Sequence, residues 1–346
     1  MSVIMIPDAP HLDDMDIEKK ALVPGVKLRD FKEADTHRIP DEAWAEADAI
    51  VLWHFGAMDQ ATIAKLSSKC RIIVRAGVGF DGVDVTAAAK RGIPVSNTPD
   101  YGTAEVADHA VSLALALIRG LVPYTQRLKA DPVGGWDWKP PAVPGRRIRG
   151  AKVGIIGLGR IGLAAARRFA GFDTEVAFFD PYQPVGYEQA TGFKRYHSLE
   201  EMLAVSDIVS VHTPLNDETR FMINAKVVAA MKPGVVYVNT ARGGVQDIDA
   251  IYGGLTSGRI SGAGLDVLFM QEPPPAHPLL ADYSAGKFEG RLILTPHAAF
   301  YSPDALYDMR YKSVETAVMY LTKNQLRACV NGRELRAAGH DIKGAG

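Results

Sequence analysis

The fold is decided by residues 153–162, which read Val-Gly-Ile-Ile-Gly-Leu-Gly-Arg-Ile-Gly. An apolar strand breaks into glycines and opens a helix, so the glycines have both flanks that a dinucleotide-binding turn needs. Gly157 permits the tight turn, Gly159 lets a pyrophosphate approach the backbone, and Gly162 lets the helix pack on the strand. The alternative is a glycine turn in a fold that binds no nucleotide.

The helix after the glycines begins near Arg160 and Ile161, whose backbone amides would face the phosphates with the partial positive charge of a helix N-terminus. The next predicted strand, 175–179, ends at Asp180, eighteen residues after Gly162 (180 − 162). A carboxylate there can accept both ribose hydroxyls and would repel a 2′-phosphate. We therefore expect NAD rather than NADP as the cofactor.

Around this turn, short β-branched runs alternate with helical patterns, which indicates a parallel α/β architecture. An N-terminal series has strands at 49–53, 71–75 and 93–95, with helices at 61–67 and 86–91 between them. A second series has six strands, the number in a complete dinucleotide-binding domain. These six strands are predicted at 152–156, 175–179, 207–211, 235–239, 261–265 and 291–294.

The order of the two series predicts two Rossmann-like or flavodoxin-like domains with parallel sheets, the dinucleotide domain being inserted in the substrate domain. We assign residues 102–301 to NAD binding, and residues 1–101 together with 302–346 to the substrate (catalytic) domain. Long helices are expected over 104–122 and 304–322, and the polar tail after Gly332 is expected to fray.

Residues 131–149 differ from both series, since they are rich in glycine and proline and contain Trp136 and Trp138. Aromatic side chains on a surface usually mark packing against a neighbour. We interpret this segment as the arm of a homodimer, and the alternative is a loop folded on its own domain.

The composition is that of a globular protein, with 47% hydrophobic and 23% charged residues. Lys and Arg number 39 against 40 Asp and Glu, so no net field attracts nucleic acid or an anionic membrane. Cys70 and Cys329 fit no metal spacing, and two reduced thiols are the simpler interpretation, although a disulfide is possible. With no signal peptide and no membrane span evident, we expect a cytoplasmic protein without nucleic-acid or membrane partners.

Three segments at the ends of later strands carry ionisable groups. Arg242 follows one strand and precedes two glycines, Asp266 follows the next and leads to Glu272, and His297 follows the strand at 291–294. Alone, Arg242 would more often form a surface salt bridge and His297 would more often be structural. We favour a chemical site because Arg242, Glu272 and His297 fall at the same edge of one sheet, where a carboxylate could hold His297 ready to donate a proton.

From about Asp48 to Asn331 the chain resembles the D-2-hydroxyacid dehydrogenases, and within them the branch that contains the C-terminal binding proteins. Together the matching runs are highly specific. They are Arg71-Ile-Ile-Val-Arg-Ala-Gly-Val-Gly-Phe-Asp81, Gly154-Ile-Ile-Gly-Leu-Gly-Arg-Ile-Gly162, Asn239-Thr-Ala-Arg-Gly-Gly244, Gly264-Leu-Asp-Val267 and Thr295-Pro-His-Ala-Ala-Phe-Tyr-Ser302.

The resemblance implies a role for each residue at the chemical site. His297 would protonate the ketone oxygen as hydride arrives from the nicotinamide, Glu272 would orient His297, and Arg242 would bind the substrate's carboxylate and carbonyl. The backbone amides of Gly77, Val78 and Gly79 would form a nest for the same carboxylate.

The resemblance also implies the rest of the cofactor and substrate contacts. Asp266 would bind the nicotinamide carboxamide, and Phe300 would line the substrate pocket. The remaining cofactor contacts would come from His212, Thr213, Pro214, Thr240, Ala241 and Ala299, with Arg242 and His297 beside them.

The sequence departs from the family pattern at two places. Glu272 lies six residues after Asp266 (272 − 266), whereas five is usual, and we interpret this as a one-residue bulge. Phe300 stands where the nearest branch often has tryptophan, which alters the wall of the pocket.

These residues favour an NAD-dependent reductase that interconverts a 2-oxo acid and the (R)-2-hydroxy acid. The alternative is an NAD(H)-sensing, corepressor-like interaction protein with weak or no turnover, and a third reading is an inactive family member. The substrate is not named by the sequence, although Phe300, Trp53, His54 and Tyr101 hint at a bulky or apolar 2-oxo acid.

Overall fold

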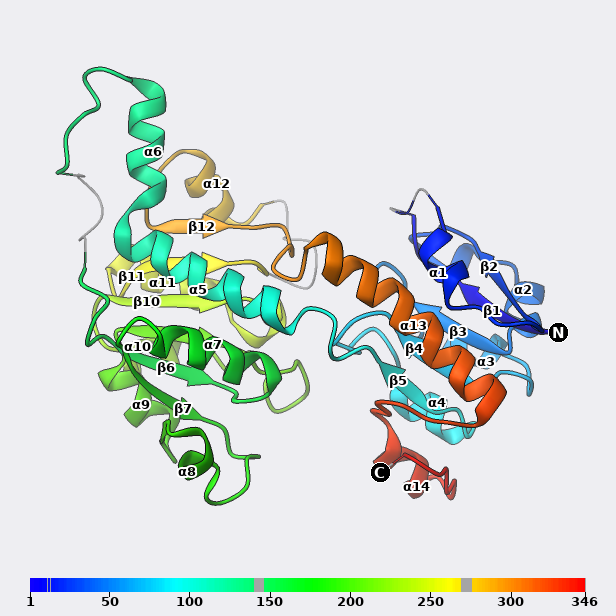
Figure 1. The fold of residues 1–346 in the computed structure, drawn as a ribbon. Helices are drawn as coiled ribbons and strands as arrows, with labels where there is room; N and C mark the ends of the chain where they lie inside the picture. The colour runs from blue at the N-terminus through cyan, green and yellow to red at the C-terminus, as the bar shows by residue number, and fades with distance from the viewer. Residues whose placement is uncertain (11, 13, 140–145, 269–275, 346) are drawn as a thin grey trace. The chain divides into compact units, whose positions relative to one another are not determined.

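The computed structural model describes residues 1–346 except 11, 13, 140–145, 269–275 and 346. The chain forms two compact units (Figure 1). The first consists of Met1–Gly102 and Ser302–Gly346, and the second of Thr103–Tyr301. The chain therefore leaves the first unit once and returns to it once.

The first unit is built on a five-stranded parallel sheet in the order β2-β1-β3-β4-β5. Its strands are β1 (Ser2–Ile6), β2 (Val26–Asp30), β3 (Ala49–Leu52), β4 (Ile72–Arg75) and β5 (Val95–Asn97). Every residue of β3 and β4 is buried, because both faces of the sheet are covered. This order is that of a flavodoxin-like sheet, as predicted.

Helices cover the two faces of this first sheet. α2 (Asp41–Glu46), α3 (Gln60–Lys65) and α4 (Val85–Lys90) share one hydrophobic core with the sheet. α13 (Pro303–Lys323) packs on β1, β3 and β4, and α1 (Asp16–Lys20) packs on α13. A short 3-10 turn spans Thr36–Arg38.

The C-terminal tail is ordered, contrary to the prediction that it frays. α14 (Gly332–Ala337) packs against α4, and Leu335 is fully buried with Ala89 and Ala345. Asn331 precedes this helix, and its side-chain oxygen accepts a hydrogen bond of 2.8 Å from the amide of Val95. These few contacts hold the tail to the first unit. Its polar composition did not indicate them.

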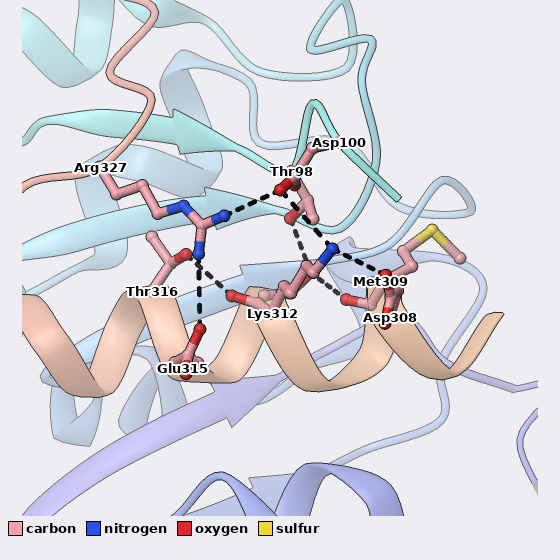
Figure 2. A network of polar contacts seen from close by, with 9 residues as sticks. Thr98, Asp100, Asp308, Met309, Lys312, Glu315, Thr316 and Arg327 are labelled. Carbon is pink, nitrogen blue, oxygen red and sulfur yellow. Dashed lines mark hydrogen bonds and ion pairs between the residues drawn. The ribbon is translucent and has the colours of Figure 1, made fainter. Parts of the chain in front are cut away.

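A polar network ties the chain that leaves the first unit to the helix that returns to it (Figure 2). Asp100 accepts a hydrogen bond of 2.9 Å from Arg327 and lies 3.5 Å from the Lys312 ammonium. Lys312 also pairs with Asp308 at 2.7 Å, and the hydroxyls of Thr98 and Ser313 are 2.9 Å apart. The segment after β5 is therefore fixed to α13 within this unit.

The second unit contains a seven-stranded parallel sheet in the order β12-β11-β10-β9-β6-β7-β8. The six predicted strands are confirmed, and a seventh, β8, was missed because two residues show no periodicity. The strands are β6 (Lys152–Ile156), β7 (Glu175–Phe179), β8 (Lys194–Arg195), β9 (Ile208–Val211), β10 (Val235–Asn239), β11 (Ile260–Leu265) and β12 (Leu292–Leu294).

Two hydrophobic cores flank this second sheet. α5 (Thr103–Arg119) and α7 (Arg160–Ala170) pack on one face. α9 (Leu199–Val205), α10 (Ala225–Ala230) and α11 (Ile248–Ser257) pack on the other, together with Leu279 of α12 (Pro278–Ser284). α8 (Tyr187–Thr191) lies between β7 and β8 in the chain.

The helix predicted over 104–122 is broken near its end. Gly120 adopts φ +62°, and the chain bends by 62° into α6 (Leu121–Ala130). In the part of the chain that the structure describes, no single helix is long and apolar enough to cross a membrane, and the bent pair α5–α6 meets that test only when joined. Trp136 and Trp138 follow with exposed fractions of 80% and 78%. Residues 140–145 of the predicted arm lie outside the described residues.

Candidate active site

The carboxyl edge of the second sheet gathers most of the predicted site residues. All its strands are parallel, so the turns after them lie along one edge in the order of the strands. That order runs from His297 after β12 through Asp266 after β11, Arg242 after β10, His212 after β9 and Gly157 after β6 to Asp180 after β7.

The glycine turn after β6 is set by close contacts with backbone atoms, both of the turn itself and of the neighbouring turn after β9. Gly157 has φ +88°, and a Cβ there would lie 2.9 Å from the carbonyl oxygen of His212. A Cβ on Gly162 would lie 2.0 Å from the carbonyl oxygen of Gly157, so helix α7 can pack here only without a side chain. Around the Cβ position of Gly159, in contrast, no atom of the described residues lies within 4 Å. The turn is closed at two glycines and open at the third, as the approach of a pyrophosphate requires.

Asp180 lies next to the glycine turn and is held in place by backbone amides. One carboxylate oxygen accepts a hydrogen bond of 2.8 Å from the amide of Leu158, and the other accepts one of 2.9 Å from Tyr182. A carboxylate offers about four acceptor positions, so it can still bind ribose hydroxyls. Because β6 and β9 adjoin where the strand order reverses, this turn also lies at the switch point where such sheets bind ligands.

Two buried polar atoms on this edge lack a partner. The His212 ring bonds Ser210 Oγ through Nε2 at 2.9 Å, but among the described residues nothing bonds its Nδ1. Burial lowers the pKa of His212 to about 4, so the ring is neutral near pH 7. The hydroxyl of Thr240 is likewise buried without a partner in the described structure. Buried polar groups need a partner, and a dinucleotide across this edge would supply one, so the residues present fit NAD.

The turn that carries Arg242 rests on a buried polar network that the sequence reasoning missed. Asn239 donates to the carbonyl oxygen of Arg242 at 3.1 Å and accepts from the amide of Ala241 at 2.9 Å. Gln246 accepts from both Asn239 and Tyr237 at 3.0 Å. Asn239, Tyr237 and Gln246 are all fully buried, so the backbone on either side of Arg242 is held rigidly.

The same network reaches the turn after β11. Gln246 donates to the carbonyl oxygen of Val267 at 3.1 Å, in the residue after Asp266. Asn239 and Gln246, two polar residues on either side of Arg242, were the only sequence signal for this link. Glu272, the predicted partner of His297, lies outside the described residues.

Asp266 holds the turn that carries His297. Its carbonyl oxygen accepts the amide of His297 at 2.8 Å. Its carboxylate accepts the amide of Ala298 at 2.9 Å and that of Ala299 at 3.0 Å. Three consecutive amides therefore bond to one residue. Asp266 was predicted to contact the nicotinamide, and this second role was not expected.

His297 adopts φ +53°, in the left-handed region that side chains other than glycine rarely enter. Such conformations persist only where the surroundings enforce them, and they cluster at functional sites. The His297 ring packs edge-on against Phe300, with ring centroids 6.3 Å apart. The ring direction is therefore set by the backbone on one side and by an aromatic neighbour on the other.

The glycine loop after β4 belongs to the first unit. The amide of Gly77 donates to the carbonyl oxygen of Arg75 at 2.9 Å. The amides of Val78 and Gly79 donate no hydrogen bond within the described part of the chain. Asn97 fixes this loop by donating to the carbonyl oxygen of Val78 at 2.6 Å. Trp53 is buried, with 1% of its surface exposed.

Comparison with known families gives a match over the inserted unit. Residues 111–299 match the model described as the D-isomer specific 2-hydroxyacid dehydrogenase, NAD binding domain. This range includes the glycine turn, Arg242, Asp266 and His297.

Comparison with individual proteins extends the likeness to most of the chain. A glyoxylate reductase of Korarchaeum cryptofilum is 38% identical over 278 residues, which cover 80% of each chain. The structure of a glyoxylate reductase from Paecilomyes thermophila aligns with a TM-score of 0.83 at 28% identity, over 95% of this chain and 98% of that one. The structure of a D-lactate dehydrogenase from Aquifex aeolicus, complexed with NAD and lactic acid, aligns with a TM-score of 0.80 at 27% identity, over 96% and 98%.

Proposed function

Because the chain belongs to the D-isomer specific 2-hydroxyacid dehydrogenase family, we propose that it reduces a 2-oxo acid to the (R)-2-hydroxy acid with His297 as the proton donor. It is an NAD-dependent oxidoreductase that interconverts 2-oxo and 2-hydroxy acids. The corepressor-like alternative is not favoured, since relatives are named as reductases and dehydrogenases. The observation that carries the proposal is His297 in a fixed turn on the same sheet edge as the glycine turn.

Each residue on the edge has one task in this proposal. When bound, NADH supplies the hydride. His297 gives its proton to the carbonyl oxygen of the substrate, Arg242 binds the substrate's carboxylate and carbonyl, and Glu272 orients the His297 ring. The fixed backbone at Arg242 supports this assignment, since a guanidinium that binds a carboxylate must be presented in one direction.

The cofactor would lie along the edge from Asp180 to His297. The pyrophosphate would be held at Gly157, Gly159 and Gly162 and by the amides of Arg160 and Ile161. Asp180 would bind the ribose. His212, Thr213, Pro214, Thr240, Ala241, Asp266 and Ala299 would line its remainder. The two unpartnered atoms at His212 and Thr240 support this arrangement.

We propose the substrate only as a class, the 2-oxo acids. Glyoxylate and lactate, which the names of relatives mention, are small, whereas Phe300 hints at an apolar wall. We propose that the backbone amides of Gly77, Val78 and Gly79 bind the substrate carboxylate, as the family resemblance implies.

The test follows NADH absorbance across a panel of 2-oxo acids from glyoxylate to branched and aromatic ones. We expect turnover of at least one acid. His297→Ala should lower kcat by about 10²–10⁴-fold, the usual contribution of a positioned general acid. Its affinity for NADH, measured by fluorescence, should stay within about twofold of the parent.

An active His297→Ala variant would refute the proton-donor assignment. No turnover with any acid, in protein that binds NADH, would refute the proposed reaction itself.

We also propose a cytoplasmic homodimer whose arm contains residues 131–149. The exposed Trp136 and Trp138 support it, since neither ring is covered within the described chain. Both cysteines are free thiols, as a reducing compartment would leave them. Light scattering of the parent should give twice the chain mass of 37.4 kDa, and Trp136→Ser with Trp138→Ser should shift it toward the monomer. A monomeric parent would refute the homodimer.

A further inference from the structure

A chain of hydrogen bonds starts on helix α5 and ends beneath the turn of His297. His109 on α5 places its Nε2 3.0 Å from the hydroxyl oxygen of Thr295. Thr295 in turn donates to a carboxylate oxygen of Asp266 at 2.6 Å. All three residues lie in the second unit, and Thr295 directly follows strand β12.

The direction of each bond in this chain is fixed by chemistry. An ionised carboxylate only accepts, so the single hydroxyl proton of Thr295 points to Asp266. Thr295 must then accept from His109, which requires a proton on Nε2 of that ring. The bonds therefore run in one direction, from His109 through Thr295 to Asp266.

The carboxylate at the end of the chain is the one that organises the turn of His297. The oxygen that accepts from Thr295 also accepts the amide of Ala298, and its companion accepts the amide of Ala299. The side chain of Asp266 is fully buried, so these protein donors take the place of water around its charge. If Thr295 released Asp266, the carboxylate could rotate and the amides that hold His297 at φ +53° would lose their common acceptor.

We propose that His109 and Thr295 are positioning residues for the reaction, because they orient Asp266 and, through it, the proton-donating ring of His297. This inference rests on the proposed role of His297. The direction of the His297 ring matters because a general acid must lie within hydrogen-bond reach of the atom that it protonates. His297 cannot fix that direction alone. Neither residue needs to touch the substrate or NAD.

The experiment compares two pairs of variants. Thr295→Val removes the hydroxyl at nearly constant shape, and Thr295→Ser retains it. His109→Leu removes the ring donor, and His109→Gln places an amide donor near the position of Nε2. Steady-state kinetics with the best 2-oxo acid, NADH affinity by fluorescence and melting temperature are measured for each.

We expect Thr295→Val and His109→Leu each to lower kcat by about tenfold, the effect of one hydrogen bond that matters in the transition state. KM for the 2-oxo acid should change by less than about twofold, because ground-state binding does not depend on the ring of His297. NADH affinity should fall by less than kcat does, because Asp266 is only one of the residues proposed to line the cofactor. Thr295→Ser and His109→Gln should recover most of the lost kcat. A double variant, Thr295→Val with His109→Leu, should be no slower than either single one, since both break the same chain.

Several results would overturn the proposal. Unchanged kcat in Thr295→Val and His109→Leu, with a normally active parent, would show that the chain does not serve the reaction. Equal losses of kcat, NADH affinity and melting temperature would indicate a merely structural role. An inactive parent would instead remove the proposed function, and this inference with it.

A measurement on the parent keeps the proposal testable even if the variants fail to fold. In ¹⁵N-histidine spectra, assigned with His109→Gln or by selective labelling, the His109 ring should carry its proton on Nε2. A ring protonated on Nδ1 alone would leave Thr295 without its donor and would overturn the proposal.

Discussion

Two turns at the same edge of the second sheet both contain backbone with positive φ, yet they are built in opposite ways. The turn after β6 places Gly157 at φ +88°, where glycine carries no steric cost. The turn after β12 places His297 at φ +53° and holds it there with three amides bonded to Asp266. Gly157 reaches a positive φ because it is glycine. His297 reaches one because the buried Asp266 accepts hydrogen bonds from its turn.

The difference follows from what each turn must present. The glycine turn presents backbone amides and empty space, so side chains are excluded at Gly157 and Gly162 and the position of Gly159 is left open. The histidine turn presents one side chain in one direction, which glycine could not do. The strain of a positive φ at His297 must therefore be offset by hydrogen bonds. A substitution in the glycine turn should therefore act through a steric clash. One in the histidine turn should act through the loss of hydrogen bonds or of the ring.

The largest effect is expected when a side chain enters the closed part of the glycine turn. Gly162→Ala puts a Cβ 2.0 Å from the carbonyl oxygen of Gly157, and backbone must move. We expect the free energy of unfolding to fall by about 3 kcal/mol, near the upper end for overpacking, and NADH binding to be lost. Urea unfolding and NADH fluorescence measure the two effects.

Gly159→Ala is the matched control for that variant, since its Cβ meets no atom within 4 Å in the part of the chain that the structure describes. Its stability should change by less than about 1 kcal/mol, while NADH affinity still falls because the methyl group fills the space of the pyrophosphate. Equal losses of stability in the two variants would contradict the steric account of the turn.

Asp266→Asn weakens the acceptor that holds the histidine turn. An amide has one oxygen, so it cannot accept from Thr295 and Ala298 on one side and from Ala299 on the other. We expect a loss of about 2 kcal/mol in the free energy of unfolding, typical of a buried donor left unsatisfied, together with a lower kcat. A variant as stable and as active as the parent would show that the carboxylate does not hold the turn.

Replacing His297 by glycine should separate strain from chemistry. His297→Gly and His297→Ala both remove the ring, but only alanine keeps the steric cost of φ +53°. The glycine variant should be the more stable by about 1 kcal/mol, although glycine also loses more chain entropy on folding. Both should be inactive. If alanine proved the more stable in chemical unfolding, His297 would not be strained.

The smallest effect concerns the histidine that borders the glycine turn. Burial lowers the pKa of His212 from 6.5 to about 4, so the unfolded chain binds a proton more readily than the folded one. Its contribution to stability is therefore complete above pH 6.5 and is lost as the pH falls toward 4. Between pH 7 and pH 6 this amounts to roughly 0.7 kcal/mol. The loss should be absent from His212→Gln, and an equal pH dependence in parent and variant would contradict a neutral His212.

The two turns also differ in how far the sequence could predict them. The spacing of Gly157, Gly159 and Gly162 expresses a local steric requirement, so strand, turn and cofactor could all be predicted from it. The histidine turn depends on contacts between residues far apart in the chain, such as His109 with Thr295, 186 residues later. No local pattern records such a pairing.

The same reasoning explains the other differences between prediction and structure. Nothing in the local sequence marks Asn239 and Gln246 as partners until the fold buries them together. The tail after Gly332 is polar in composition, but its Leu335 is buried against Ala89 and Ala345. The strand at Lys194–Arg195 exists because β7 offers a free edge, which its two residues do not reveal.

The strand order has a further consequence, which is one of length. Four steps separate β6 from β12 in the sheet, and neighbouring strands lie about 4.8 Å apart, so the pyrophosphate turn and the acid turn are roughly 19 Å from each other along the edge. The sheet thus sets the distance between the two turns. The nicotinamide half of the cofactor, the substrate and the side chain of His297 must together span this distance, because the adenosine half runs the other way from the glycines, toward Asp180 after β7.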